Sequence, residues 1–102
     1  MYVRVMHFTC REETEKRDIQ RVYRMIVEQA RKTDGFIGGT LMMRENTCLG
    51  MAMFYWRDEQ AAGSAGPGIV EIFGKHAHDL LDYPPDVEGY HVIENGILPD
   101  HS

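Results

Sequence analysis

The segment from Cys48 to Trp56, CLGMAMFYW, is apolar on both faces of the strand that it predicts. Alternation along a strand places Leu49, Met51, Met53 and Tyr55 on one face and Gly50, Ala52, Phe54 and Trp56 on the other. A single sheet with helices on one face normally shows a polar second face. Something must therefore cover the second face here, and in a chain of 102 residues a second copy of the chain is the economical cover. We expect a homodimer.

The chain divides into four strand-like and two helix-like segments in the order βαββαβ. The strands are predicted at 2–10, 36–44, 48–56 and 87–95, and the first helix runs to about residue 33 with apolar residues three and four apart. The segment RDEQAAGSAGPG at 57–68 is small, polar and glycine-rich, which predicts a mobile loop or lid. The second helix is predicted at 69–81, and a tail follows from about 96 to 102.

This order of elements favours the α+β class. Short connections and the right-handed crossover rule predict a ferredoxin-like, four-stranded antiparallel sheet with both helices on one face. The whole chain, 1–102, is expected to form this single domain.

The two cysteines, Cys10 and Cys48, match no zinc pattern and are interpreted as reduced core residues. We take the first and third strands as adjacent and parallel. Cys10 at the end of one strand and Cys48 at the start of the other would then lie roughly 25 Å apart, at ~3.3 Å per residue. That separation excludes a disulfide.

The composition excludes several classes of protein. The chain is 43% hydrophobic and 26% charged, which is typical of a globular protein. Its formal net charge is -5 and no block of five or more Lys or Arg occurs, which disfavours a nucleic-acid surface. No apolar run approaches the ~18 residues of a membrane span, and no signal-peptide pattern opens the sequence. We therefore expect a cytoplasmic protein with neither nucleic acid nor membrane as a partner.

Three stretches carry a resemblance to a known family: DGFIGG after the first helix, MFYWRDEQAA at the end of the third strand, and PPDVEGYHV in the last strand. With the βαββαβ order, the chain resembles the dimeric α+β barrel superfamily, and most of all its antibiotic-biosynthesis-monooxygenase type. The resemblance implies a small-molecule monooxygenase without a cofactor, acting on an aromatic, quinone or polyketide-like substrate. The alternatives are a non-catalytic ligand-binding or stress-response barrel, a non-redox isomerase or cyclase, and a haem-binding or haem-degrading protein.

The family's functional residues carry over only in part. In the anthrone-type oxygenases, an Asn four residues before the third-strand Trp helps to bind and activate the substrate, and Ala52 stands at that position here. In the haem-degrading branch, a first-strand Asn and a second Trp act with an iron-binding His. The corresponding positions hold Met6 and, near the second Trp, Ala65 or Gly66, whereas His76 falls close to the axial ligand.

The stretch FGKHAHDLL at 73–81 contains two histidines. At ~100° per helical residue, His76 and His78 point in nearly opposite directions and cannot easily share a metal ion, so no metal site is expected. His76 falls in the apolar stripe of the helix with Ile72 and Phe73. Three roles are open for it: a core residue, a catalytic acid or base in a pocket, or a haem ligand. His78 is expected to face water.

Small and aromatic residues share one face of the third strand and predict a pocket. Gly50 and Ala52 leave room there, and Phe54 and Trp56 form its walls, which suits a flat, hydrophobic aromatic ligand. Each aromatic could instead serve only as core packing. The predicted catalytic residues are His76 and Trp56, and the predicted substrate-binding residues are Tyr23, Ala52, Phe54, Phe73 and Ile72.

Overall fold

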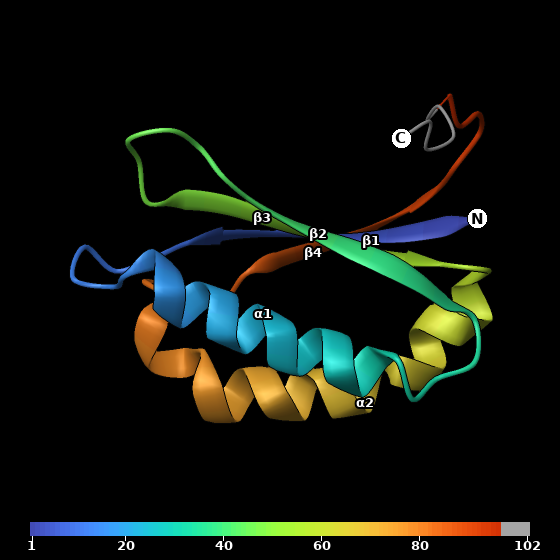
Figure 1. Ribbon diagram of the computed structural model, residues 1–102, viewed down its shortest axis with the longest axis horizontal. Coiled ribbons are helices and arrows are strands. Elements are labelled where there is room, and N and C mark those ends of the chain that lie inside the picture. Colours follow the sequence, from blue (N-terminus) through green and yellow to red (C-terminus); the bar gives the residue numbers. More distant parts are fainter. Residues whose placement is uncertain (97–102) are drawn as a thin grey trace, which may run out of the picture.

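The computed structural model describes residues 1–96, which form one sheet with two helices packed on one of its faces (Figure 1). In chain order the elements are β1 (Tyr2–Thr9), α1 (Lys16–Ala30), β2 (Phe36–Met43), β3 (Leu49–Trp56), α2 (Glu59–His76), the short 3-10 helix η1 (His78–Leu80) and β4 (Asp86–His91). The predicted order βαββαβ is confirmed. Apart from Gly96, the expected tail lies outside the described residues.

The four strands form one sheet in the order β2-β3-β1-β4, and every neighbouring pair is antiparallel. This is the ferredoxin-like arrangement that the order of elements predicts. The two central strands, β3 and β1, hold all the buried residues of the sheet. Strands β2 and β4 form the edges, and both helices lie below the sheet in Figure 1.

The expectation that β1 and β3 run parallel is wrong. They are antiparallel, with Tyr2 opposite Trp56 and Thr9 opposite Leu49. The α1 crossover makes β2 run in the direction of β1, and the hairpin after β2 then sends β3 back between them. Cys10 and Cys48 are therefore direct neighbours, and the Cys10 N–H donates to the Cys48 carbonyl oxygen over 2.8 Å.

Helix α1 forms as its periodicity predicts. Its buried residues are Ile19, Val22, Ile26 and Ala30, spaced three and four apart along the face that packs on the sheet. The chain then turns into β2 through Gly35, whose φ is +99°. A Cβ at Gly35 would come within 2.8 Å of the Ala61 side chain, so this turn has room only for glycine.

Helix α2 corrects a prediction. The segment 57–68, predicted as a mobile loop or lid, mostly forms the first half of this helix, and the helix ends at His76 rather than near residue 81. The Asp58 carboxylate caps its N-terminus by accepting a hydrogen bond from the Ala61 N–H over 2.8 Å. Burial of Ala61, Ala62 and Ala65 stabilises a segment that contains Gly and Pro67, because tertiary packing outweighs local propensity.

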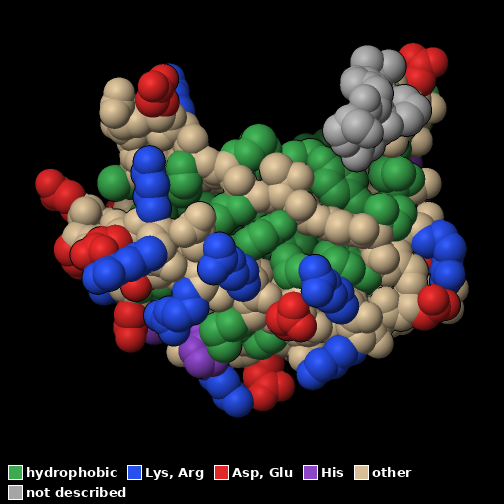
Figure 2. All heavy atoms as spheres, in the orientation of Figure 1, with side chains coloured by type: hydrophobic (Ala, Val, Ile, Leu, Met, Phe, Trp, Pro, Cys, Tyr) green, Lys and Arg blue, Asp and Glu red, His purple; other side chains and the backbone are tan. Residues whose placement is uncertain are grey.

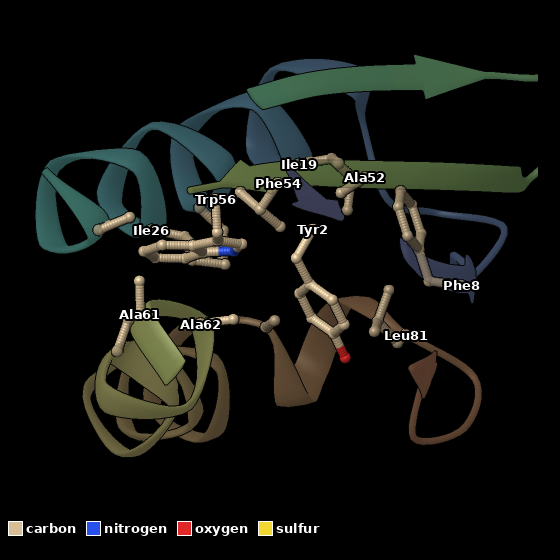
Figure 3. Packing of buried hydrophobic residues seen from close by; sticks show 14 of the residues in the cluster. Tyr2, Phe8, Ile19, Ile26, Ala52, Phe54, Trp56, Ala61, Ala62 and Leu81 are labelled. Carbon is tan, nitrogen blue, oxygen red and sulfur yellow. The ribbon is translucent and has the colours of Figure 1, made fainter. Parts of the chain in front are cut away.

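Trp56 occupies the centre of the layer between the sheet and the helices, and only 1% of it is exposed. In Figure 3 its indole lies between Ile26 of α1 and Ala61 and Ala62 of α2. The Phe36 ring meets it edge-on, with 5.0 Å between ring centroids. The last residue of β3 thereby contacts both helices and the neighbouring strand.

The sheet face turned away from the helices is also apolar near its centre. Met42, Leu49 and Tyr90 are exposed there, and Met51, Met53 and Tyr55 are half-buried. The two-faced pattern predicted for β3 is confirmed by the strand register. In Figure 2 the charged side chains gather on the helix side of the molecule, with hydrophobic side chains above them towards the sheet. We call the surface of the sheet that is turned away from the helices the open sheet face.

The Asp58 cap makes stability depend on pH in a predictable direction. The hydrogen bond from the Ala61 N–H holds the pKa of the Asp58 carboxyl below its usual value. A lowered pKa in the folded state contributes stability above the unfolded pKa of about 4, and this contribution is lost as the pH falls through the folded value. Urea unfolding should show that Asp58→Ala is less stable than the wild type at about pH 7, with the difference shrinking at about pH 3.

The matched variant is Asp58→Asn, whose amide oxygen accepts the same hydrogen bond but does not titrate. It should keep more of the neutral-pH stability than Asp58→Ala. A stability gap between the wild type and Asp58→Ala that stays constant from neutral to acid pH would contradict the capping assignment.

Candidate functional site

An apolar cavity of about 340 Å³ lies between the sheet and α2. We call it the outer cavity. The sheet supplies Arg4, Met6, Phe54, Trp56 and Val87, and α2 supplies Ala62, Gly63, Gly66, Ile69 and Val70. Val70 and Val87 are 70% and 51% exposed, so the mouth opens between α2 and the edge strand β4.

A second, inner cavity of about 30 Å³ lies between the sheet and α1. Met6 and Phe54 line both cavities and separate them. The inner cavity has room for about one water molecule, and its lining surface is entirely hydrophobic. It extends the outer cavity only if Met6 or Phe54 changes rotamer.

The indole N–H of Trp56 has no hydrogen-bond partner within residues 1–96, although the nitrogen is fully buried. In Figure 3 this nitrogen points away from Ile26 and Ala61, towards the side of Phe54 and Tyr2. Buried donors in native proteins are nearly always paired, because an unpaired one costs about 1–3 kcal/mol. Because this nitrogen has no accessible surface, an acceptor atom in the outer cavity could reach it only if the indole or a neighbouring side chain moved.

Arg4 brings a positive charge to the same cavity. Its guanidinium carbon lies 5.4 Å from the centre of the Tyr2 ring, a cation–π contact that helps to hold the side chain in the sheet–helix layer. No carboxylate or histidine is among the lining residues of the outer cavity. The cavity therefore combines an apolar wall with one neutral donor and one cation, which suits a flat ligand with oxygen atoms at its edge.

Tyr23 lies over the boundary between the inner cavity and the edge strand β2. Its ring stacks on Phe54, with centroids 5.8 Å apart and planes at 26°. A Cβ at Gly39 would lie 2.8 Å from the Tyr23 hydroxyl, so glycine at that position makes room for the phenol. Burial raises the pKa of the Tyr23 hydroxyl, which keeps it protonated and able to donate.

The structure divides the predicted site residues between the two cavities. Phe54 and Trp56 line the outer cavity, and Tyr23, Ala52 and Phe73 line the inner one together with Phe54. Ile72 is half-buried and packs against the core cluster without appearing in the lining of either.

The two histidines of the 73–81 stretch differ as expected in exposure. His78 is exposed, and His76 is half-buried at the last position of α2. The inner cavity takes Phe73 and Ala77 from this stretch, and His76 is in the lining of neither cavity. The catalytic role of His76 therefore remains a prediction that its position does not strengthen.

Sequence reasoning missed the residues that open the outer cavity. Arg4 and Val87 lie on different strands and come together only through the register of β1 with β4, where Val87 is opposite Met6. Gly63 and Gly66 were assigned to a loop, although their spacing of three places them on one face of a helix. The local sequence, with its glycines and Pro67, favours a loop, and the helix depends on burial of the neighbouring alanines.

The described residues offer no cluster of metal ligands and no histidine in either cavity. Within residues 1–96, no group of three or more His, Cys, Asp or Glu side chains could hold a metal ion. His7 lies 3.3 Å from Glu88 on the open sheet face, and His91 contacts the Tyr2 ring at 5.1 Å between centroids. Because no histidine lines either cavity, the residues present do not fit an iron-bound haem there.

No helix formed by residues 1–96 has the length and apolar character to cross a membrane.

Comparison with known proteins identifies the fold. Neither family models nor curated protein sequences gave a match to this chain. Solved structures with a similar fold do match this chain. SnoaB, a cofactor-independent oxygenase from Streptomyces nogalater, is 15% identical with a TM-score of 0.76, and the alignment covers 93% of this chain and 95% of SnoaB.

Two further structures share the fold. The ActVA-Orf6 monooxygenase from Streptomyces coelicolor, solved with nanaomycin D, is 19% identical with a TM-score of 0.72, over 97% of this chain and 92% of that one. Rv0793 from Mycobacterium tuberculosis is 13% identical with a TM-score of 0.75, over 94% and 98%. The expected resemblance is confirmed at the level of the fold: the chain shares the ferredoxin-like fold of these structures.

Filling the outer cavity should block ligand binding and leave the fold intact. A Cβ at Gly66 meets no atom within 4 Å, so Gly66→Leu places its side chain into open space at the cavity wall. Trp56 is the only tryptophan, and its fluorescence should be quenched when 1,4-naphthoquinone enters the cavity. We expect Gly66→Leu to weaken this binding roughly tenfold or more.

Gly74→Leu is the matched control, because Gly74 lies on the same helix, also has open space around a Cβ, and does not line the outer cavity. Both variants replace a helical glycine and should gain roughly 0.5–1 kcal/mol of helix stability. Equal quenching in Gly66→Leu and the wild type would contradict ligand binding in this cavity.

Proposed function

We propose that this protein is a small-molecule monooxygenase that works without a cofactor and binds a flat aromatic ketone or quinol in the outer cavity. The observation that carries the proposal is the buried Trp56 N–H without an acceptor at the wall of an apolar cavity. A ligand carbonyl oxygen would satisfy this donor once a small shift of the indole exposed the nitrogen to the cavity. Two proteins with the same fold are described as a cofactor-independent oxygenase and a monooxygenase bound to nanaomycin D, which supports this substrate class.

The chemistry would use the substrate as its own reductant. The activated ring methylene between the aromatic rings would lose its proton to water in solution, so that the substrate enters the cavity as a carbanion delocalised onto the carbonyl oxygen, and a proton is taken back from water when O₂ has been reduced. The Trp56 N–H would hold that oxygen, and the Arg4 cation would favour the negative charge. The apolar walls exclude water, which strengthens both interactions.

The overall reaction balances without any bound group. The substrate methylene, R₂CH₂, reacts with O₂ to give R₂C=O and water. The carbon gains one oxygen atom, and the second oxygen atom leaves with the two hydrogen atoms. The carbanion supplies the electrons that reduce O₂, so the protein has to bind, orient and stabilise charge.

One observation favours a second candidate function, a non-catalytic ligand-binding barrel. Ala52 replaces the substrate-activating Asn of the resemblance and lies in the wall of the inner cavity, with no polar atom to offer. The outer cavity contains no side chain that could act as a general base, since an arginine guanidinium offers only hydrogen-bond donors. The same absence disfavours an isomerase or cyclase that relies on a protein base.

We also propose that two copies associate through the open sheet face. Met42, Leu49 and Tyr90 are exposed on it beside the half-buried Met51 and Met53. Apolar side chains grouped in this way on a sheet surface favour association, because burying them removes apolar area from water. The helices and the mouth of the outer cavity lie on the other side of the sheet, so both copies would keep an open site.

Oxygen uptake distinguishes the two candidate functions. The probe is dithranol, a dihydroxyanthrone with the required methylene, measured against its uncatalysed oxidation. The wild type should accelerate O₂ consumption with formation of the anthraquinone, and Trp56→Phe should lower kcat/KM about 3- to 10-fold, the effect of losing one hydrogen bond of ~0.5–1.5 kcal/mol.

Phe36→Leu serves as the control for this experiment. Phe36 packs against the edge of the same indole but is absent from the lining of the outer cavity, so its replacement loosens Trp56 without removing the donor. It should have a smaller effect than Trp56→Phe. If dithranol binds and is not turned over faster than in buffer, the binding barrel is the correct function.

Association is tested separately with Leu49→Glu, which places a charge at a 43% exposed position of the open sheet face. Sedimentation of the wild type at micromolar concentration should give twice the mass of one chain. Leu49→Glu should raise the dissociation constant of the dimer about a hundredfold or more, because an unpaired charge would be buried. Val70→Glu, a 70% exposed position on α2, should still associate. A wild-type protein that sediments as a monomer would exclude this interface.

A further inference from the structure

Cys10 and Cys48 lie opposite each other at one end of the sheet. The register of β1 and β3 ends with Thr9 opposite Leu49, and the next pair in the same register is Cys10 and Cys48. The hydrogen bond of 2.8 Å from the Cys10 N–H to the Cys48 carbonyl oxygen continues the ladder to this pair. Directly opposite residues of antiparallel strands point to the same face, so both thiols lie on the helix side.

The two thiols differ in their access to solvent. Both are free cysteines, but Cys10 is buried and Cys48 only partly so. Burial, first, and then the nearby Cys48 and Asp82 raise the pKa of the Cys10 thiol. A reagent from solution would therefore meet Cys48 first, with a protonated Cys10 beside it.

We propose that Cys10 and Cys48 are a redox-active pair that forms a reversible disulfide when the protein meets a hydroperoxide. The distance between the strands allows the bond. Directly opposite, hydrogen-bonded residues in antiparallel strands have Cα atoms ~5.5 Å apart. Disulfides form between Cα atoms about 4.4–6.8 Å apart.

The chemistry takes two balanced steps. The Cys48 thiol reacts with hydrogen peroxide to give the sulfenic acid and one water, with two electrons passing from sulfur to the peroxide. The Cys10 thiol then attacks the Cys48 sulfur, forming the S–S bond and releasing the hydroxyl group with the thiol proton as a second water.

The same geometry makes the bond easy to reduce. Opposite side chains in a sheet have Cβ atoms ~4.5–5.5 Å apart, whereas a relaxed disulfide needs ~3.5–4.5 Å. Formation of the bond must draw the two strand ends together against the hydrogen-bonded ladder. Strained disulfides of this kind are more readily reduced, which suits a reversible modification and not a permanent crosslink.

Oxidation would act next to one wall of the inner cavity. Cys10 forms a β-bridge with Leu81, and Leu81 and Phe8 line that cavity. The Arg11 N–H donates to the Leu80 carbonyl oxygen over 2.9 Å, so the end of β1 is joined to the connection between α2 and β4. If Cys10 moved, Leu81 and Phe8 in the wall of the inner cavity would move with it.

The test treats the reduced full-length protein with a small excess of hydrogen peroxide and follows it by intact mass and thiol titration. We expect the loss of two hydrogen atoms per chain, the loss of both titratable thiols, and a Cys10–Cys48 linked peptide in a non-reducing digest. Dithiothreitol should restore the original mass and both thiols.

Two variants test the order of events. In Cys10→Ala, Cys48 should stop at the sulfenic acid and be trapped by dimedone. In Cys48→Ser, the buried Cys10 should react far more slowly. Wild-type protein that keeps both thiols, that accumulates oxygen atoms on Cys48, or that forms disulfides only between chains would overturn the proposal.

Discussion

Packing of the Trp56 indole between the sheet and both helices is the contact on which the rest of the structure depends. At 1% exposure it closes the layer beside Phe36 and the small residues of α2. The residues after it continue the same junction: the Arg57 N–H donates to the Gly35 carbonyl oxygen over 2.7 Å, and Asp58 caps α2. Three consecutive residues thus have three structural roles. Trp56 ends β3, Arg57 bonds to the turn before β2, and Asp58 starts α2.

The small residues of α2 explain why the outer cavity exists beside so tightly packed a tryptophan. Ala61 and Ala62 let the helix approach the indole closely, whereas Gly63 and Gly66 leave space where larger side chains would fill the layer. Close packing and open volume therefore come from neighbouring positions of one helix. The buried N–H of Trp56 lies at the boundary between them, which gives an apolar cavity a directional contact.

The sequence was sufficient to predict those features that depend on a local pattern of side chains. Periodicity in α1, with Ile19 and Ile26 on one face, predicted both the helix and the side that it buries. Alternation in β3 predicted that Phe54 and Trp56 share a wall, because the side-chain period of a strand does not depend on its neighbours. The order of the elements then limited the fold to the ferredoxin-like arrangement that the structure has.

The sequence by itself thus determined the element order, the faces of α1 and β3, and the aromatic character of the site. Only the tertiary structure decided the direction of β3 relative to β1 and the register of β4, and so that Cys10 meets Cys48 and that Val87 meets Met6. It also decided that a segment rich in glycine is helical. The physical reason is the same in each case: strand register and the burial of small residues are contacts between distant parts of the chain, and no local pattern of side chains encodes them.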